Sequence, residues 1–261
     1  MSTGERASAY RLVLAYDGSD YHGWQAQAKV ATVGGAFADA LAVVTGQRPQ
    51  VRAAGRTDAG VHAHGQVVGF SLVGAWAPRA LRDACNTQLP ADIAVVGAEP
   101  ASPDFDPRRS AWRRTYRYLL NLSPVRMPVG RQYSWRVGPG LALSPMRVAS
   151  SLAIGTHDFG AFGRSPRPGG STIRTVDLVE VSRRSGLVAI EVRGDAFLRG
   201  MLRNLVGALV AVGTGRIGAQ QLAADLAGGR PEGHPWRSAP VHGLHQWRVD
   251  YDRPGMAGAA V

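Results

Sequence analysis

The stretch YRLVLAY (Tyr10–Tyr16) opens a pattern of elements that occurs twice along the chain and decides the predicted fold. It reads as an apolar strand, and the helical stretch TVGGAFADALAVV (Thr32–Val44) follows it and ends at Gly46. The remaining elements of this half are predicted to be strands at Gln50–Ala54 and Gln66–Leu72, a helix from Pro78 to about Thr87, and a strand at Ile93–Ala98. The order is β-α-β-β-α-β.

The second half repeats this order. Strands are predicted at Arg114–Asn121, Thr172–Ser182, Leu187–Gly194 and Leu244–Tyr251, and helices from Ser144 to about Ile154 and over Leu198–Val212. A further short helix, Gln220–Ala227, is predicted to interrupt the last connection. The order is typical of the ferredoxin-like unit, an antiparallel sheet with helices on one face. We therefore predict an α+β protein with two ferredoxin-like halves, residues 1–105 and 106–253, and a frayed tail at 254–261. Their sheets are expected to lie side by side with an active-site cleft between them.

Composition narrows the class of protein. The 261 residues are 45% hydrophobic and 19% charged, as in globular chains. The longest apolar run, Leu205–Gly213, is far shorter than the ~20 residues that span a bilayer, and the N-terminus shows no hydrophobic signal core. Cys85 is the only cysteine, which excludes an internal disulfide and a multi-cysteine zinc site. These features favour a cytoplasmic protein.

The charge balance indicates an anionic partner. Thirty basic residues against nineteen acidic ones give a net charge of +11, and Lys29 is the only lysine. GC-rich coding would explain the preference for arginine over lysine but not the excess over acidic residues. Nucleic acid is the simplest partner for such a chain, and an ordinary solvated basic surface is the alternative.

The stretch AAGRTDAGVHAH (Ala53–His64) is the most unusual local pattern. Glycines on both sides allow a tight loop that presents Arg56, Thr57 and Asp58 together and lets a ligand approach. The alternative is an ordinary turn in which the Asp58 side chain bonds its own backbone.

Metal and dinucleotide sites are not expected. Asp58, His62 and His64 form a D-x3-H-x-H pattern, but no further ligand completes a metal site. Gly213–Gly218 matches G-x-G-x-x-G, but it follows a predicted helix where the dinucleotide fingerprint needs a strand.

Two further groups of residues are candidates for binding. Arg199 and Arg203, four apart near the start of a predicted helix, would share one face and either stay solvated or meet a carboxylate or phosphate. Tyr116 and Tyr118 share one face of the strand RRTYRYLL (Arg113–Leu120). They are either half-buried sheet tyrosines or a stacking platform for a nucleobase.

Five blocks of sequence together resemble the tRNA pseudouridine synthase A family, over roughly residues 10–251. They are YDGSDYHGWQAQ (Tyr16–Gln27), GRTDAGVHAHGQVV (Gly55–Val68), NTQLPADIAV (Asn86–Val95), RRTYRYLLN (Arg113–Asn121) and FLRGMLRNLVG (Phe197–Gly207). The sequence departs from the family at Gly34, where glutamine is frequent, and at His245, where tyrosine is frequent. Neither departure lies in the GRTDAGVH block, so they bear on local packing or substrate contacts.

The resemblance implies conversion of uridines 38, 39 and 40 of the tRNA anticodon arm to pseudouridine by a homodimer that needs no cofactor. It implies a catalytic role for Asp58 and contact of Tyr116 with the target base. It also implies that Arg56 holds the flipped nucleotide out of the stack and that Arg203 pairs with the catalytic carboxylate.

The chemistry favours a buried, positioned carboxylate at Asp58, whose charged form an arginine would stabilise. The target uridines must leave the stack before they reach it. A non-catalytic RNA-binding module and a small metal hydrolase are the rival readings. An RNA-binding module would not need an aspartate such as Asp58 in a tight loop flanked by glycines. A metal hydrolase would need more metal ligands than Asp58, His62 and His64 provide.

Overall fold

The computed structural model describes residues 7–184, 186–228 and 236–252, which divide into two compact units. Residues 7–112 and 246–252 form the first unit, and the described residues between 113 and 245 form the second. The chain therefore leaves the first unit after Trp112 and returns to it at Gln246, so most of the last strand lies outside the half in which we expected it. The tail expected at 254–261 lies outside the described residues.

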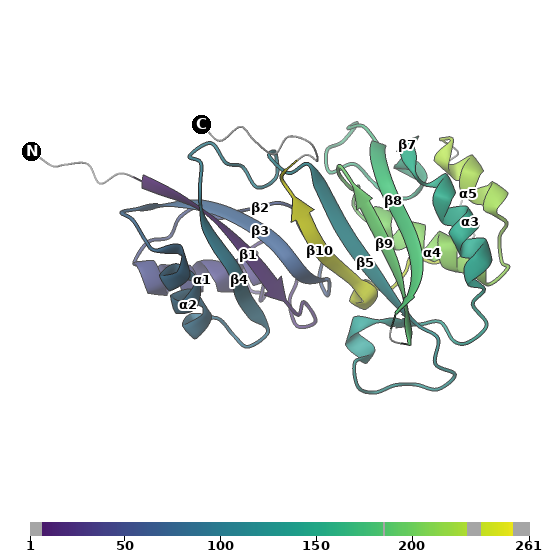
Figure 1. The fold of residues 1–261 in the computed structure, drawn as a ribbon, viewed down its shortest axis with the longest axis horizontal. Coiled ribbons are helices and arrows are strands. Elements are labelled where there is room, and N and C mark those ends of the chain that lie inside the picture. Colours follow the sequence, from purple (N-terminus) through teal and green to yellow (C-terminus); the bar gives the residue numbers. More distant parts are fainter. Residues whose placement is uncertain (1–6, 185, 229–235, 253–261) are drawn as a thin grey trace, which may run out of the picture. The chain divides into compact units, whose positions relative to one another are not determined.

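The first unit is built on antiparallel strands. Its elements in chain order are β1 (Ala7–Tyr16), α1 (Val33–Thr45), β2 (Arg52–Ala53), β3 (His62–Val73), α2 (Pro78–Gln88) and β4 (Ile93–Ala101). The strands lie in the order β4-β1-β3, β2 pairs with β3, and β10 (Leu244–Asp250) follows β3 on its other side (Figure 1). Leu12 at the centre of β1 lies opposite Val68 of β3 and Ala98 of β4.

One face of this sheet carries the core of the first unit. Alternate residues of β1 are buried, as the period of a strand requires; they are Tyr10, Leu12, Leu14 and Tyr16. They share a cluster with side chains from both helices, among them Phe37 of α1 and Leu81 of α2. The opposite face holds a small cluster around Val67 and Val249. Both helices therefore cover the same face.

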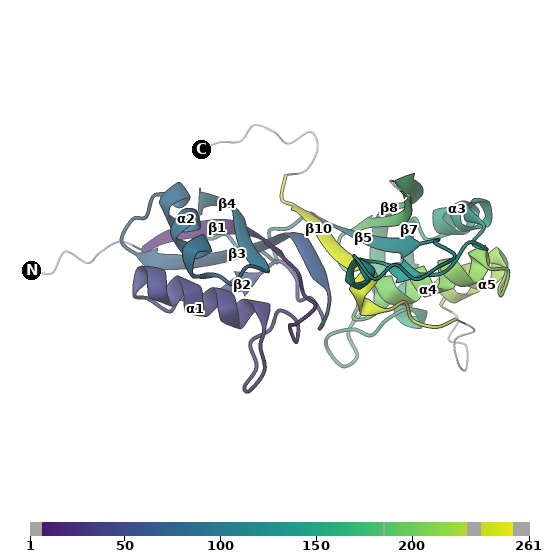
Figure 2. The same ribbon diagram turned by 90° about the horizontal axis from the view of Figure 1, so that it is seen from below.

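The second unit is also built mainly on antiparallel strands. Its elements are β5 (Arg113–Asn121), β6 (Trp135–Arg136), α3 (Leu143–Leu152), β7 (Gly155–Asp158), β8 (Ile173–Arg184), β9 (Leu187–Gly194), α4 (Met201–Gly213) and α5 (Ala219–Leu226). The strand order is β5-β9-β8-β7, and the short β6 runs parallel to β5. The helices α3, α4 and α5 lie together beside this sheet (Figure 2). The strand β7 was not expected from the sequence.

The start of α4 corrects one prediction. Gly200 has φ 80°, and the helix begins only at Met201. Because a left-handed residue cannot continue a right-handed helix, Arg199 lies before the helix and does not share a helical face with Arg203. Among the residues that the structure describes, no helix is long and apolar enough to cross a lipid bilayer.

Candidate active site

The loop between β2 and β3 presents Asp58 on a tight turn. The Asp58 carbonyl oxygen accepts a hydrogen bond from the Val61 N–H at 3.2 Å. Gly60, the third residue of this turn, has φ 77°, a conformation that glycine adopts without the cost of a side chain. At the start of the loop, the Ala54 N–H donates to the Val67 carbonyl of β3 at 2.9 Å. These hydrogen bonds and the conformation of Gly60 together hold the backbone around Asp58 in a tight turn.

The segment after β1 holds this loop in place through Thr57. The hydroxyl groups of Tyr16 and Thr57 lie 2.8 Å apart, and both residues are buried. The Trp24 N–H donates to the Thr57 carbonyl at 3.1 Å. Gly23 (φ 85°) lies so close that an added Cβ would stand 2.5 Å from the Thr57 carbonyl oxygen. The residue next to Asp58 is thus anchored by both its side chain and its backbone.

His62 joins the loop to the end of β1. It is 2% exposed, its Nδ1 accepts the Gly18 N–H at 3.1 Å, and the same nitrogen lies 3.0 Å from Asp17 Oδ1. A Cβ on Gly18 would stand 2.1 Å from the Val61 carbonyl oxygen. His62 is therefore a structural residue of this loop.

The side chains of two glutamines hold the beginning of the loop through hydrogen bonds. The Gln66 Nε2 donates to the Gly55 carbonyl at 2.7 Å, and the Gln246 Nε2 donates to Gln66 Oε1 at 3.2 Å. Both side chains are fully buried. Sequence reasoning missed Gln66, Gln246 and the role of His62, because the partners of these residues come together only in the fold.

The expected burial of Asp58 is wrong. Asp58 and Arg56 are both exposed, whereas Thr57 between them is 7% exposed. His64, the third member of the D-x3-H-x-H pattern, packs against Trp247 with ring centroids 4.4 Å apart. No group of three or more His, Cys, Asp or Glu side chains placed to hold a metal ion is found in the described part of the chain.

The second unit places Tyr116 on β5. The residue is 9% exposed, and its ring meets Phe197 edge-on at a centroid distance of 5.3 Å. Tyr118, on the same face, is 1% exposed and donates to the Pro240 carbonyl at 2.7 Å, and burial raises the pKa of its hydroxyl. Tyr118 is thus a core residue, and Tyr116 is largely buried as well.

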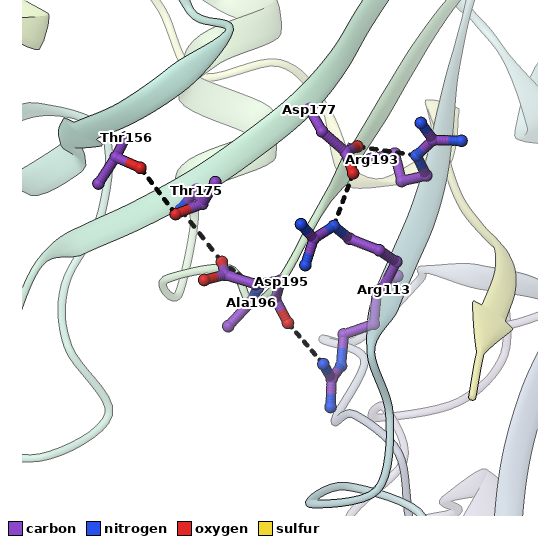
Figure 3. A network of polar contacts seen from close by, with 8 residues as sticks. Arg113, Thr156, Thr175, Asp177, Arg193, Asp195 and Ala196 are labelled. Carbon is purple, nitrogen blue, oxygen red and sulfur yellow. Dashed lines mark hydrogen bonds and ion pairs between the residues drawn. The ribbon is translucent and has the colours of Figure 1, made fainter. Parts of the chain in front are cut away.

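Ion pairs around Asp177 anchor the strand that carries Tyr116. Arg113 and Arg193 donate to the two carboxylate oxygens of Asp177 at 2.6 and 2.7 Å (Figure 3). Burial raises the pKa of Asp177, but the hydrogen bonds from Arg193 and Arg113 outweigh it and hold that pKa below its ordinary value. The pairs tie β5, β8 and β9 together.

The two arginines of the FLRGMLRNLVG block have different surroundings. Arg203 lies on α4, where its Nε donates to the Ala239 carbonyl at 2.6 Å and its own carbonyl accepts the Ala239 N–H at 3.0 Å. Arg199 is exposed and lies in the connection before the helix. Asp58 and Arg56 therefore belong to the first unit, and Tyr116, Arg199 and Arg203 to the second. The pairing of Asp58 with Arg203 stays a prediction.

Comparison with known proteins gives a consistent result. The model of the tRNA pseudouridine synthase family matches residues 12–108 and 149–252, which include Asp58 and Arg203. A tRNA pseudouridine synthase A of Methylobacterium sp. (strain 4-46) is 40% identical over 94% of this chain and 98% of its own. That of Syntrophotalea carbinolica is 41% identical over 94% of this chain and 96% of its own.

Among solved structures, a chain of the archaeal box H/ACA sRNP Nop10–Cbf5 complex covers 77% of this chain and 44% of its own with 11% identity and a TM-score of 0.34, which is too low to establish a shared fold. The family match and the relatives carry the assignment: this chain belongs to the tRNA pseudouridine synthase family.

Proposed function

We propose that the protein converts uridines 38, 39 and 40 of the tRNA anticodon arm to pseudouridine, with Asp58 as the catalytic group. One observation carries the role of Asp58: the loop backbone is anchored through the buried Thr57, while the Asp58 side chain is exposed. A carboxylate held on a fixed backbone and open to a large substrate is suited to attack a nucleotide presented by RNA.

The reaction conserves all atoms of the nucleotide. The bond between C1′ and N1 breaks, the uracil turns, a bond between C1′ and C5 forms, and the proton on C5 is lost while N1 gains one. No oxidant, reductant or energy source is needed, so the proposal includes no cofactor. Asp58 adds to the ribose, adds to the base, or assists a glycal route, and the three routes share the ionised carboxylate as the acting group.

The remaining roles follow from the residue types. Arg56, exposed two residues before Asp58, would hold the flipped nucleotide out of the stack. Tyr116 would contact the target base and help to remove the C5 proton. Arg203 would stabilise the charge of Asp58, and Arg199 would bind substrate phosphate.

These roles require an architecture that we also propose. The two halves are each ferredoxin-like, with their sheets side by side and the active-site cleft between them. The element order β1-α1-β2-β3-α2-β4 and the strand order β4-β1-β3 with β2 on β3 support this for the first half. The proposal includes a homodimer that binds the tRNA anticodon arm, and a tRNA substrate implies a cytoplasmic location.

The test uses tRNA transcript labelled with tritium at uracil C5. Wild-type protein should release tritium to water, because C5 loses its hydrogen when it bonds to C1′. Asp58→Asn should abolish release while it retains tRNA binding. Asp39→Asn, which removes an exposed carboxylate on α1 that pairs with Arg48, is the matched control and should behave as wild type. Wild-type protein that binds tRNA without tritium release would instead be a non-catalytic RNA-binding module.

A further inference from the structure

Phe197 is a ring neighbour of Tyr116 that comes from a different segment of the second unit. Tyr116 lies within β5, whereas Phe197 lies in the connection between β9 and α4. The two rings meet at an interplanar angle of 86° with their centroids 5.3 Å apart, an edge-to-face arrangement that aromatic pairs favour. Because this arrangement has a preferred angle as well as a preferred distance, it restricts the plane of the Tyr116 ring.

The last residue of β9 leaves room for the Phe197 ring. A Cβ added to Gly194 would stand 3.3 and 3.5 Å from Cζ and Cε1 of Phe197, and 2.8 Å from the Thr175 carbonyl oxygen. A side chain at this position would therefore press on the backbone of β8, and a glycine in a strand allows such a close approach. Gly194 lies opposite Arg114 of β5, two residues before Tyr116.

The turn that follows β9 is held by Asp195 (Figure 3). Its carboxylate accepts the N–H groups of Thr175 and Ala196 at 3.1 and 2.6 Å. Its own N–H donates to the Thr175 carbonyl at 3.0 Å, and its carbonyl accepts a hydrogen bond from Arg114 Nη1 at 2.6 Å. Since Arg114 and Tyr116 are two residues apart on one face of β5, the Arg114 side chain connects this turn to the strand that carries Tyr116.

The residue after Phe197 is fixed by close packing. Leu198 is 4% exposed, and a Cβ on Gly163 would stand 2.7 Å from Leu198 Cβ. The Leu198 carbonyl also accepts the Met201 N–H at 3.2 Å, where α4 begins. Phe197 is thus anchored on both sides, and its ring is held against Tyr116.

A tyrosine that contacts an everted base and helps to remove its proton has to present its hydroxyl in one direction, since a misplacement by ~1 Å costs about 100-fold in rate. We propose that Phe197 is a positioning residue that acts through Tyr116, by holding the Tyr116 ring in the orientation needed at the target uracil. The proposal rests on the proposed function, which gives Tyr116 its role, and it adds Phe197 to the residues on which the reaction depends.

The test replaces the ring of Phe197 by an aliphatic side chain. Tritium release gives kcat and KM for Phe197→Leu, for Tyr116→Phe and for the double variant. Trp135→Leu is the matched control, because Trp135 meets Tyr118 of the same strand face at the same angle of 86°, with centroids 6.3 Å apart. Thermal unfolding confirms that each variant is folded in the assay, and Phe197→Met takes the place of Phe197→Leu if the latter is unfolded.

A positioning role predicts a loss confined to turnover. Phe197→Leu should lower kcat about tenfold and change KM less than about twofold, because the orientation of Tyr116 is lost and tRNA affinity is kept. The double variant should be only slightly slower than Tyr116→Phe, because the effects of residues that act as a unit do not multiply. Trp135→Leu should keep kcat within about twofold of wild type.

A second measurement follows the Tyr116 ring in the free protein. The protein is labelled with 3-fluorotyrosine for fluorine NMR, and the Tyr116 resonance is identified by its loss in Tyr116→Phe. Phe197→Leu should move this resonance toward that of free 3-fluorotyrosine, because the ring loses its neighbour. Trp135→Leu should leave the resonance in place.

Several results would overturn the positioning role. An unchanged kcat in Phe197→Leu or an unmoved Tyr116 resonance would make Phe197 a structural residue only. Losses that multiply in the double variant, or a slow Phe197→Leu beside a Tyr116→Phe of normal rate, would mean that Phe197 acts by a route other than Tyr116. If the wild-type protein releases no tritium while the resonance moves as expected, Phe197 still orients Tyr116 and the proposed function falls.

Discussion

Replacement of Tyr16 by Phe should separate the positioning of Asp58 from the stability of the fold. The change deletes the hydroxyl that lies 2.8 Å from Thr57 Oγ1, at a site where Tyr16 and Thr57 are 5% and 7% exposed. Loss of one partner from a buried hydrogen bond costs about 1–3 kcal/mol, because the remaining hydroxyl stays desolvated. We expect a decrease of this size in the free energy of unfolding.

The kinetic effect should exceed what this loss of stability implies. Thr57 is bonded to Asp58 in the chain, and its side chain is one of the contacts that hold the loop. A displacement of a catalytic group by ~1 Å costs about 100-fold in rate. We therefore expect kcat to fall between about 10-fold and about 100-fold and KM to change less, because Arg199, the proposed phosphate contact, belongs to the second unit.

Tyr10→Phe is a matched control on the same strand and the same buried face. Its hydroxyl donates to the Trp76 carbonyl at 3.2 Å and accepts the Trp76 N–H at 2.7 Å, away from the Asp58 loop. Urea unfolding and tritium release are measured for both variants. Tyr10→Phe should lose similar stability and keep the wild-type kcat. An equal kcat in the two variants would refute the positioning role of the Tyr16–Thr57 bond.

Three further predictions concern the second unit. Tyr116→Phe should keep tRNA affinity but slow tritium release, and an unchanged rate would confine Tyr116 to packing. Arg203→Ala should reduce turnover more than tRNA affinity, whereas equal losses would indicate a simple phosphate contact. Burial raises the pKa of Asp177, but its hydrogen bonds to Arg193 and Arg113 lower that pKa overall. Asp177 therefore stabilises the fold at pH values above about 3.9, the ordinary pKa of an aspartate side chain. This contribution is lost as pH falls through the lowered folded-state pKa of Asp177. Between about pH 5 and about pH 2, the urea midpoint of Asp177→Asn should therefore fall less than that of the wild-type protein. An equal fall in the two proteins would contradict this role of Asp177.

The elements that the sequence predicted well carry local signals. Thr32 caps α1 through a bond from the Gly35 N–H at 3.2 Å, Gly46 ends that helix at φ 69°, and Pro78 starts α2. The start of α4 was placed too early because Leu198 and Leu202 are both buried and spaced as on one helix. Periodicity does not reveal that the glycine between them takes a left-handed conformation.

The site was predicted only as far as its local pattern reaches. The glycines around Arg56–Asp58 indicate a tight loop, and the loop is present. Its supports depend on contacts between distant segments, such as the bond from Gln246 to Gln66, which are 180 residues apart. The departure at Gly34 also has a reason visible only in the fold, since a Cβ there would stand 2.4 Å from the Trp24 carbonyl oxygen.

The exposure of Asp58 bears on how a low-dielectric environment forms around its carboxylate. In the proposed mechanism Asp58 would need an open approach in the free protein to reach an everted nucleotide, so bound RNA would supply part of its low-dielectric surroundings. Rigidity and burial are therefore supplied separately: Thr57 and its contacts fix the backbone, and the bound RNA would exclude water. Free uridine lacks the chain that covers the loop and would leave the carboxylate hydrated. In the proposed mechanism the anticodon arm would do more than deliver the base, because it would complete the site in which Asp58 acts.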